Sequence, residues 1–183
     1  MRVIGTVGLP GSGKGEAAEV AREEGVPVVT MGDVIREACR ERGLDPAEHH
    51  GDVATTLREE GGEAAIAERC VPAVREAFEE GADTVLVDGL RSPAEVERFV
   101  SAFGDDFVIL SVEAPFEARA ERLLERGRDA TDEDRSDLRA REERELDFGM
   151  GEVMERADHT IQNTDTLDAF RDAVREVIRG ERA

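Results

Sequence analysis

A glycine-rich stretch near the start of the sequence has the residue types needed to bind phosphate. It reads Gly-Leu-Pro-Gly-Ser-Gly-Lys-Gly over residues 8–15, between an apolar run and a segment of helical period. Glycines let the backbone curve so that its N–H groups face phosphate oxygens, and the following helix adds the positive end of its dipole. Lys14, the single lysine of the chain, supplies a cation for the outer phosphates. We predict phosphate contacts from Gly8, Leu9, Pro10, Gly11, Ser12, Gly13, Lys14, Gly15 and Glu16.

The two residues after the lysine depart from the usual form of such loops. Gly15 and Glu16 stand where a Ser or Thr would supply a hydroxyl to Mg²⁺. Because Mg²⁺ keeps much of its hydration shell, we expect phosphates and water to hold it. A carboxylate such as that of Asp88 would contribute through a water molecule.

Two later segments place charged residues directly after strand-like runs. Asp33 falls in the first turn of a predicted helix, with Arg36 one turn later on the same face. Asp88 ends an apolar run, and Arg91 follows it. We expect the second strand to end beside the phosphate loop, so that these side chains overhang the ligand-binding crevice of the sheet. The alternative for Asp33 and Arg36 is an ordinary helix-start acid and a surface charge.

Arginines cluster later in the chain, where guanidinium groups could bind phosphates bidentately and spread transition-state charge. Arg126, which adjoins Gly127, is the strongest candidate for that role. Ordinary pairing with neighbouring glutamates is the alternative for each of them. Arg58 is likewise open between a contact to the acceptor and a solvated helix charge. The cluster comprises Arg119, Arg122, Arg126, Arg128, Arg135, Arg139, Arg141 and Arg144.

Short β-rich runs alternate with longer helical stretches, which is typical of parallel strands joined by crossover helices. Strands are expected at residues 3–7, 26–29, 84–87, 107–112 and 159–162. Helices are expected at residues 14–24, 33–42, 52–80 with a break at 61–62, 93–103, 116–126, 132–146, 151–156 and from 167 onward. The pattern predicts an α/β fold of three α/β/α layers around a five-stranded parallel sheet.

Taken together, these motifs resemble those of small P-loop kinases of the adenylate kinase and dephospho-coenzyme A kinase type, and most closely an archaeal group of P-loop nucleotide-binding proteins. The resemblance spans nearly the whole chain and implies one P-loop kinase domain over residues 1–183. It further implies a helical acceptor-binding insert at about residues 31–80 and a lid at about residues 122–146. The loop at 127–130 would form the base of that lid. The implied cofactors are ATP and Mg²⁺.

The same resemblance assigns roles to residues at matching positions. The Gly-Asp-x-x-Arg stretch of Asp33 and Arg36 would hold the acceptor, with Asp33 also near the attacking hydroxyl. The Asp-Gly-Leu-Arg stretch is shortened by one residue relative to nucleoside monophosphate kinases, so Asp88 transfers more directly than Arg91. Other implied contacts are Arg122 and Asn163 to the nucleotide and Arg126 to the transferred phosphoryl group. Arg139, with Arg141 as the alternative at the exit of the lid, is implied as a contact to the substrate. For Asn163, a helix cap is the alternative.

The amino-acid composition limits the binding partners and the cellular location that we expect. The chain has 44 acidic against 24 basic residues, a formal net charge of -20, which disfavours nucleic acid and anionic membranes. Acid excess with one lysine resembles the proteins of salt-in halophiles, where concentrated salt screens like charges. No apolar run is long enough to cross a membrane and no signal peptide is evident, so we predict a cytoplasmic protein. Cys39 and Cys70 are expected to be reduced, partly buried thiols without chemistry.

These observations favour an ATP- and Mg²⁺-dependent kinase that phosphorylates a nucleotide-like small molecule. Two acceptors stay open, a nucleoside monophosphate and dephospho-coenzyme A. The alternative from another class is a nucleotide-dependent regulatory ATPase or switch without a small acceptor. A guanine-specific GTPase is disfavoured because its Asn-Lys-x-Asp motif cannot be formed from one Asn, at position 163, and one Lys, at position 14.

Overall fold

The computed structural model describes residues 1–126 and 135–181. Its centre is a five-stranded sheet with the order β2-β3-β1-β4-β5, in which every neighbouring pair is parallel. The α/β prediction with a five-stranded parallel sheet is confirmed. The strands are β1 (Arg2–Val7), β2 (Val28–Thr30), β3 (Thr84–Asp88), β4 (Phe107–Glu113) and β5 (His159–Gln162).

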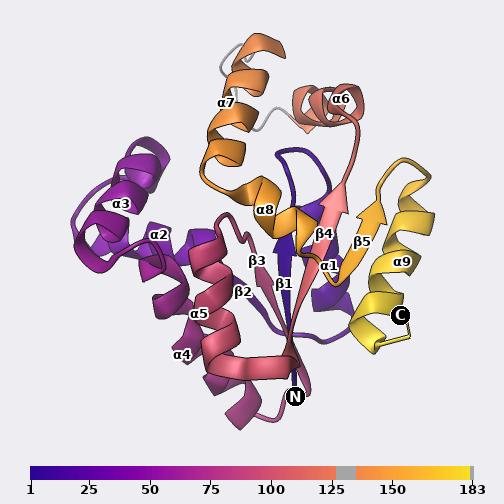
Figure 1. Cartoon of the computed structure of the whole chain (residues 1–183), viewed down its shortest axis with the longest axis horizontal. Helices are drawn as coiled ribbons and strands as arrows, with labels where there is room; N and C mark the ends of the chain where they lie inside the picture. The colour runs from indigo at the N-terminus through magenta and orange to yellow at the C-terminus, as the bar shows by residue number, and fades with distance from the viewer. Residues whose placement is uncertain (127–134, 182–183) are drawn as a thin grey trace.

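Helices cover both faces of this sheet, as Figure 1 shows. Because successive side chains of a strand point to opposite faces, the apolar residues divide into two cores. Ile4 and Leu110 pack with α1 (Lys14–Glu23) and α9 (Leu167–Arg179). Val3 and Ile109 share the other core with residues of α4 (Ala65–Glu79), α5 (Pro93–Phe103) and α8 (Met150–Glu155).

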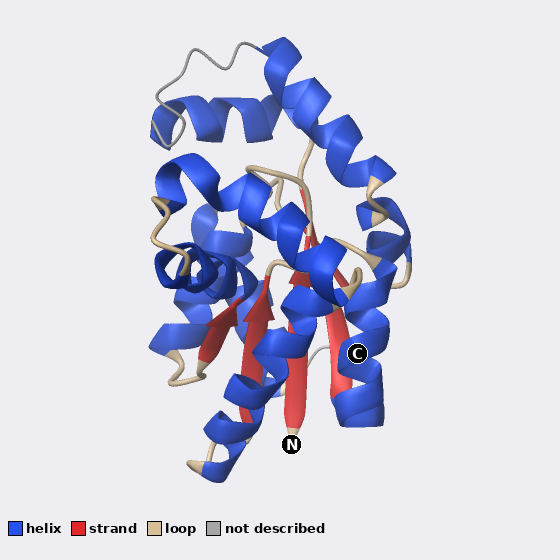
Figure 2. Ribbon diagram, turned by 90° about the vertical axis from the view of Figure 1, so that its left-hand side faces the viewer, coloured by secondary structure: helices blue, strands red, loops and turns tan. Residues whose placement is uncertain are grey.

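The remaining helices lie around the carboxyl ends of the strands. Helices α2 (Met31–Glu41) and α3 (Pro46–Gly61) stand to one side, within the segment predicted as the acceptor insert. Helices α6 (Phe116–Arg126), whose last turn enters the predicted lid, and α7 (Arg135–Asp147), which forms its second half, lie across the top of the view in Figure 2. The predicted lid base at 127–130 lies outside the described residues. A short 3₁₀ turn, η1 (Gly104–Asp106), precedes β4.

The strand order differs from the expectation that the second strand ends beside the phosphate loop. Asp88 of β3 is in register with Thr6 of β1 and with Thr30 of β2, so β3 separates the two strands. A short apolar run carries no information on its lateral place in a sheet. The order instead depends on the crossover through α2, α3 and α4, which returns the chain between β1 and β2.

Several predicted boundaries are also corrected. Strand β2 begins at Val28 rather than Val26, because the Val26 amide donates to the Ala21 carbonyl at 2.8 Å and closes the end of α1. Helix α2 begins at Met31, two residues before Asp33. Helix α3 begins at Pro46 rather than near residue 52, after Asp45, whose side chain accepts from the Ala47 amide at 2.9 Å.

Two composition-based expectations can be compared with the structure. Cys39 and Cys70 are both buried free thiols, and burial raises the pKa of Cys70 to about 12, which leaves it unreactive. In the part of the chain that the structure describes, no helix has the length and apolar character to span a membrane.

Candidate nucleotide and acceptor site

The phosphate loop joins β1 to α1, and donors from other elements hold its carbonyl groups. Lys14 Nζ donates to the Gly8 carbonyl and, at 3.4 Å, to that of Leu9. Arg119 Nη1 donates to the Pro10 carbonyl at 3.1 Å, and Asn163 Nδ2 to the Ser12 carbonyl at 2.8 Å. At the start of α1 the Glu16 amide donates to the Gly13 carbonyl at 3.0 Å, so the amides of Lys14 and Gly15 are the helix-start donors left for an anion. The loop is therefore fixed with carbonyls engaged and helix-start amides available to an anion.

Two glycines of the loop differ in how strictly their position demands glycine. Gly13 has φ 119°, and a Cβ built there would lie 2.5 Å from Asn163 Nδ2. A Cβ on Gly15 would meet nothing within 4 Å. Gly13 is thus required by backbone conformation and by the approach of Asn163, whereas Gly15 leaves room for a side chain.

Lys14 is a half-buried cation whose pKa differs from that of a free lysine. Burial lowers the pKa of Lys14 from 10.5 to about 8, Arg91 adds to that lowering, and Asp88 and Glu145 oppose it. A triphosphate bound beside Lys14 would favour the charged form. The ammonium is therefore sensitive to what occupies the loop.

A cavity of about 100 Å³ lies directly above Lys14. Arg91, Arg141 and Glu145 line it together with Lys14, and Arg91 Nη1 lies 2.9 Å from Glu145 Oε1. Of the residues predicted to bind substrate, Arg91 is thus brought to the phosphate loop by the turn after β3. Its guanidinium is paired with a carboxylate of α7.

Asp88 is held at the carboxyl end of β3 by a neighbouring strand. Thr6 Oγ1 donates to Asp88 Oδ1 at 2.8 Å, which leaves the second carboxylate oxygen for another contact. Among the described residues no group of three or more His, Cys, Asp and Glu side chains is placed to hold a metal. The site therefore fits Mg²⁺ carried by phosphates and water with one carboxylate, and does not fit an all-protein cage.

A second cavity, of about 240 Å³, opens between Lys14 and helices α2, α3 and α4. We call it the acceptor cavity. Its charged and titratable lining is mostly cationic, and an apolar wall is formed by Met31, Ile35 and Ile66. The charged and titratable lining residues are Lys14, Arg36, His50, Arg58, Asp88, Arg91 and Glu95.

Arg58 is anchored in this cavity rather than solvated. Its Nη2 lies 3.4 Å from an oxygen of the fully buried Glu95, and its guanidinium stacks over Phe148 at 4.6 Å. The other Glu95 oxygen accepts the amides of Arg91, at 2.7 Å, and Ser92, at 3.3 Å. Burial raises the pKa of Glu95, and these contacts oppose the rise. Arg58 Nε is buried without a partner among the described residues.

Sequence reasoning missed both Glu95 and His50. The Ser-Pro-x-Glu pattern at 92–95 is a capping-box signal, and Ser92 and Glu95 do form one at the start of α5. That signal predicts a helix start, but it does not indicate that the carboxylate also anchors an arginine. His50 had no signal, because the predicted helix began after it.

Asp33 and Arg36 lie on the same face of α2, as predicted. Arg36 Nη2 is 2.6 Å from Asp33 Oδ1, and both line an open cavity of about 660 Å³ that Asp88 also lines. The Asp33 side chain is 67% exposed, so the pair is close to solvent. The structure brings these two residues to the same edge as Asp88, and their roles remain predictions.

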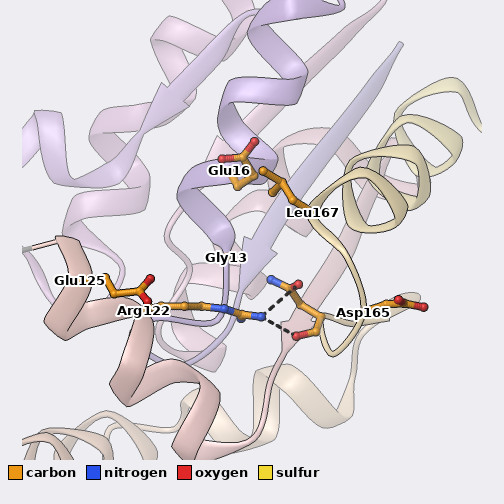
Figure 3. Close-up of a pocket in the computed structure, with 7 residues that line it drawn as sticks. Gly13, Glu16, Arg122, Glu125, Asp165 and Leu167 are labelled. Atoms are coloured by element: carbon orange, nitrogen blue, oxygen red, sulfur yellow. Dashed lines mark hydrogen bonds between the residues drawn. The ribbon is translucent and has the colours of Figure 1, made fainter.

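A further cavity, of about 230 Å³, lies on the opposite side of the loop and is drawn in Figure 3. Arg122 reaches across from α6 and donates to the Asn163 carbonyl at 2.9 Å. Gly13 and Glu16 line the same cavity. Glu16 forms an ion pair with Arg171 of α9, so its carboxylate is already engaged. Asn163 does not cap α9, whose N-cap is Thr166.

The predicted lid arginines separate into different environments. Arg139 stacks on the Phe116 ring at 4.0 Å, whereas Arg141 lines the cavity above Lys14. Residues two apart on a helix face different directions, so only one of this pair can reach the loop. Of these two alternatives, Arg141 is the one that lies beside Lys14, and its contact with a substrate stays a prediction. The side chain of Arg126 lies outside the described residues, and Arg119 is buried in an ion pair with Glu142.

Comparison with known proteins gives matches over the whole chain. The model of the AAA domain family matches residues 7–139. A UPF0200 protein of Halobacterium salinarum is 54% identical over 181 residues, covering 99% of this chain and 94% of its own. A UPF0200 protein of Methanosarcina mazei is 45% identical, covering 97% of this chain and 94% of its own.

Solved structures match the fold at lower identity. A protein of Thermus thermophilus has a TM-score of 0.68 at 20% identity, covering 100% of this chain and 98% of its own. A shikimate kinase of Bacteroides thetaiotaomicron has a TM-score of 0.61 at 17% identity, covering 97% and 98%. These neighbours establish the P-loop kinase fold. The chain therefore belongs to the UPF0200 family and contains an AAA domain.

Proposed function

We propose that this chain is an ATP- and Mg²⁺-dependent phosphotransferase that moves the γ-phosphoryl group of ATP to a nucleotide-like small molecule. The observation that carries the proposal is the position of Lys14 and Asp88 between neighbouring cavities. Lys14 lines both the cavity above the loop and the acceptor cavity, and Asp88 lines the acceptor cavity and the open cavity beside α2. A donor on the loop and an acceptor beside α2 and α3 would meet at these two side chains.

Phosphoryl transfer depends mainly on positioning and on charge stabilisation. In the proposed step, an acceptor oxygen bonds to the γ-phosphorus while the bond from that phosphorus to the β–γ bridging oxygen breaks, which releases ADP. Lys14 and the loop amides hold the phosphate oxygens. Where the acceptor attacks through a hydroxyl, as dephospho-coenzyme A would, Asp33 takes its proton. A nucleoside monophosphate attacks through a phosphate oxygen and needs no such base. Arg126 stabilises charge on the group in flight. Mg²⁺, when bound near Asp88, would neutralise part of the phosphate charge.

The cationic acceptor cavity favours an acceptor that carries an anionic group. Nucleoside monophosphates and dephospho-coenzyme A both meet this requirement with a phosphate. The shikimate kinases among the structural neighbours suggest a smaller hydroxy acid as a further member of the panel. All of these acceptors would present their anion to the arginines around Arg58.

The test is an acceptor panel with ATP and Mg²⁺ in multimolar potassium chloride. Acceptor-stimulated release of ADP is expected for at least one compound, and Lys14→Ala should abolish it while circular dichroism shows a folded protein. Steady hydrolysis that no acceptor stimulates would instead support the regulatory ATPase. Full turnover by Lys14→Ala would refute the proposal.

The high salt concentration in that assay is chosen because of a second part of the proposal. We infer that the protein works in the cytoplasm of a halophile, because a net charge of -20 would repel itself in dilute buffer. Unfolding of the protein below about 0.5 M salt, followed by circular dichroism, is the expected result. A protein equally stable without salt would contradict this inference.

A further inference from the structure

His50 lies on α3 and lines the acceptor cavity with Lys14 and Asp88. Its neighbour in the sequence, His49, is in a different setting. His49 lies within 4.0 Å of the Glu48 carboxylate and 3.9 Å of the Asp52 carboxylate, both on the same helix. The remaining histidine, His159, is on β5, where its ring contacts Arg2 at 3.2 Å. The three histidines of the chain therefore lie in three different surroundings.

The groups that face His50 are mostly cations whose partners lie elsewhere. Arg36 is paired with Asp33, and Arg91 with Glu145. Of the two carboxylates in the lining, Asp88 accepts from Thr6, and Glu95 accepts backbone amides and contacts Arg58. Asp88 keeps a second carboxylate oxygen, but among the described residues no ion pair joins His50 to a carboxylate of this lining.

This environment disfavours a charged imidazole while the cavity holds no anion. Burial lowers the pKa of His50, Arg91, Arg36 and Arg58 lower it further, and a hydrogen bond to the Gly32 carbonyl acts in the opposite direction. An imidazole with one N–H on that carbonyl has a second nitrogen that accepts when neutral and donates when protonated. An oxyanion entering the cavity would reverse the balance and favour the protonated form.

We propose that His50 is a specificity-determining residue of the acceptor cavity, which takes up a proton when an oxyanion of the acceptor enters among Arg36, Arg58 and Arg91. The proposal rests on the assignment of this cavity to the acceptor. It identifies the recognised chemistry as a compact phosphate or carboxylate. Because binding and proton uptake are linked, anion affinity should rise as the pH falls through the His50 titration range.

The direct test is a histidine NMR titration that requires no catalysis. The full chain, with labelled histidine rings and in multimolar potassium chloride, is titrated between pH 5 and 8.5 with and without inorganic phosphate. Signals are assigned with His50→Gln and His49→Gln. Phosphate is expected to raise the titration midpoint of His50 by about one pH unit, equivalent to about tenfold tighter binding to the protonated form. His49 and His159 are expected not to shift.

Inorganic phosphate could also bind at the phosphate loop beside Lys14. The titration is therefore repeated with saturating ADP, which occupies the loop and leaves the acceptor cavity open. A His50 shift that persists with ADP supports the proposal, and a shift that ADP abolishes overturns it. An acetate arm distinguishes the two oxyanions, because a response to acetate alone assigns a carboxylate and a response to phosphate alone assigns a phosphate. No His50 shift with either anion, or equal shifts of all three histidines, overturns the proposal.

Kinetics with the acceptor found in the panel provide a second readout. His50→Gln should raise the acceptor KM about tenfold below pH 6.5 and leave kcat unchanged, because glutamine cannot take up a proton when the anion binds. His49→Gln should behave as the wild type. A His50→Gln enzyme with the wild-type pH profile of KM contradicts the role of His50. If no acceptor is found, the NMR result still stands by itself, because it depends on anion binding and not on transfer.

Discussion

The phosphate loop and the acceptor cavity both gather positive charge, but they are held in different ways. Around the loop, Arg119 and Asn163 donate to backbone carbonyls of Pro10 and Ser12. In the acceptor cavity, Arg36, Arg58 and Arg91 are held by carboxylates on side chains. A donor bonded to a fixed carbonyl stays in place when a ligand arrives, whereas an arginine paired with a carboxylate must share or exchange its partner.

This difference indicates which half of the site is prearranged. The loop needs no rearrangement to present its helix-start amides, so phosphate binding there should resemble binding to a rigid site. Arg91, which lines the acceptor cavity, is paired with Glu145 outside that lining, and the pair joins the turn after β3 to α7. An anionic ligand bound at Arg91 would compete with Glu145 for its guanidinium. Substitutions in the loop should therefore cause large losses of ATP affinity. Substitutions in the acceptor cavity should have smaller effects that depend on charge.

Gly13→Ala is expected to have the largest effect. The new Cβ would stand 2.5 Å from Asn163 Nδ2 on a backbone at φ 119°, so either the loop or Asn163 must move. With a cost of about 2–3 kcal/mol, ATP affinity measured by calorimetry should fall about 100-fold. Gly15→Ala is the matched control, since its Cβ meets open space, and it should stay within about threefold of wild type. Equal losses in both variants would contradict the rigid-loop interpretation.

The next largest effect is the pH dependence of ATP affinity, which arises from Lys14 of the loop. The pKa of Lys14 is about 8 in the ligand-free protein, and bound triphosphate would hold the proton to higher pH. ATP affinity should therefore be constant below pH 8 and fall as the pH rises above it. The expected loss is up to about 30-fold by pH 9.5, from about tenfold per pH unit.

Lys14→Arg provides the control for that measurement, because a guanidinium stays charged throughout this range. The variant is expected to bind more weakly at pH 7 but to show a flat profile up to pH 9.5. A wild-type profile that is equally flat would contradict the lowered pKa of Lys14.

Glu95→Gln tests the acceptor side and should have a moderate effect. The amide oxygen can still accept the backbone amides of Arg91 and Ser92, so the start of α5 should survive. The charge that positions Arg58 is lost, and acceptor KM is expected to rise about tenfold with ATP affinity unchanged. Glu97→Gln is the control, because its pair with Arg156 is exposed and lies outside the cavity lining. A fall in ATP affinity for Glu95→Gln would show that the two halves are not separate.

The sequence predicts the loop side of the site more completely than the acceptor side. Glycine spacing, Lys14 and the following helix are local signals, so the loop and the parallel α/β fold could be predicted. Glu95 and Arg58 are 37 residues apart and meet through tertiary packing, which no local pattern contains. The same limit explains the misplaced second strand and why the sequence left Arg139 and Arg141 as alternatives. Each depended on how a helix or strand is rotated or ordered against distant elements.

Gly15→Ser is expected to have the smallest effect and tests the loop's missing hydroxyl. Gly15 lines the open cavity that Asp88 also lines, and a Cβ there has no neighbour within 4 Å, so a serine should be accepted without disturbing the loop. Its hydroxyl would stand where related loops offer a Mg²⁺ ligand. The Mg²⁺ concentration that gives half-maximal ATP binding should fall about two- to threefold, while ATP affinity without Mg²⁺ should not change. Gly15→Ala separates the hydroxyl from the added bulk, and an equal gain in both variants would show that Mg²⁺ is held without a loop ligand.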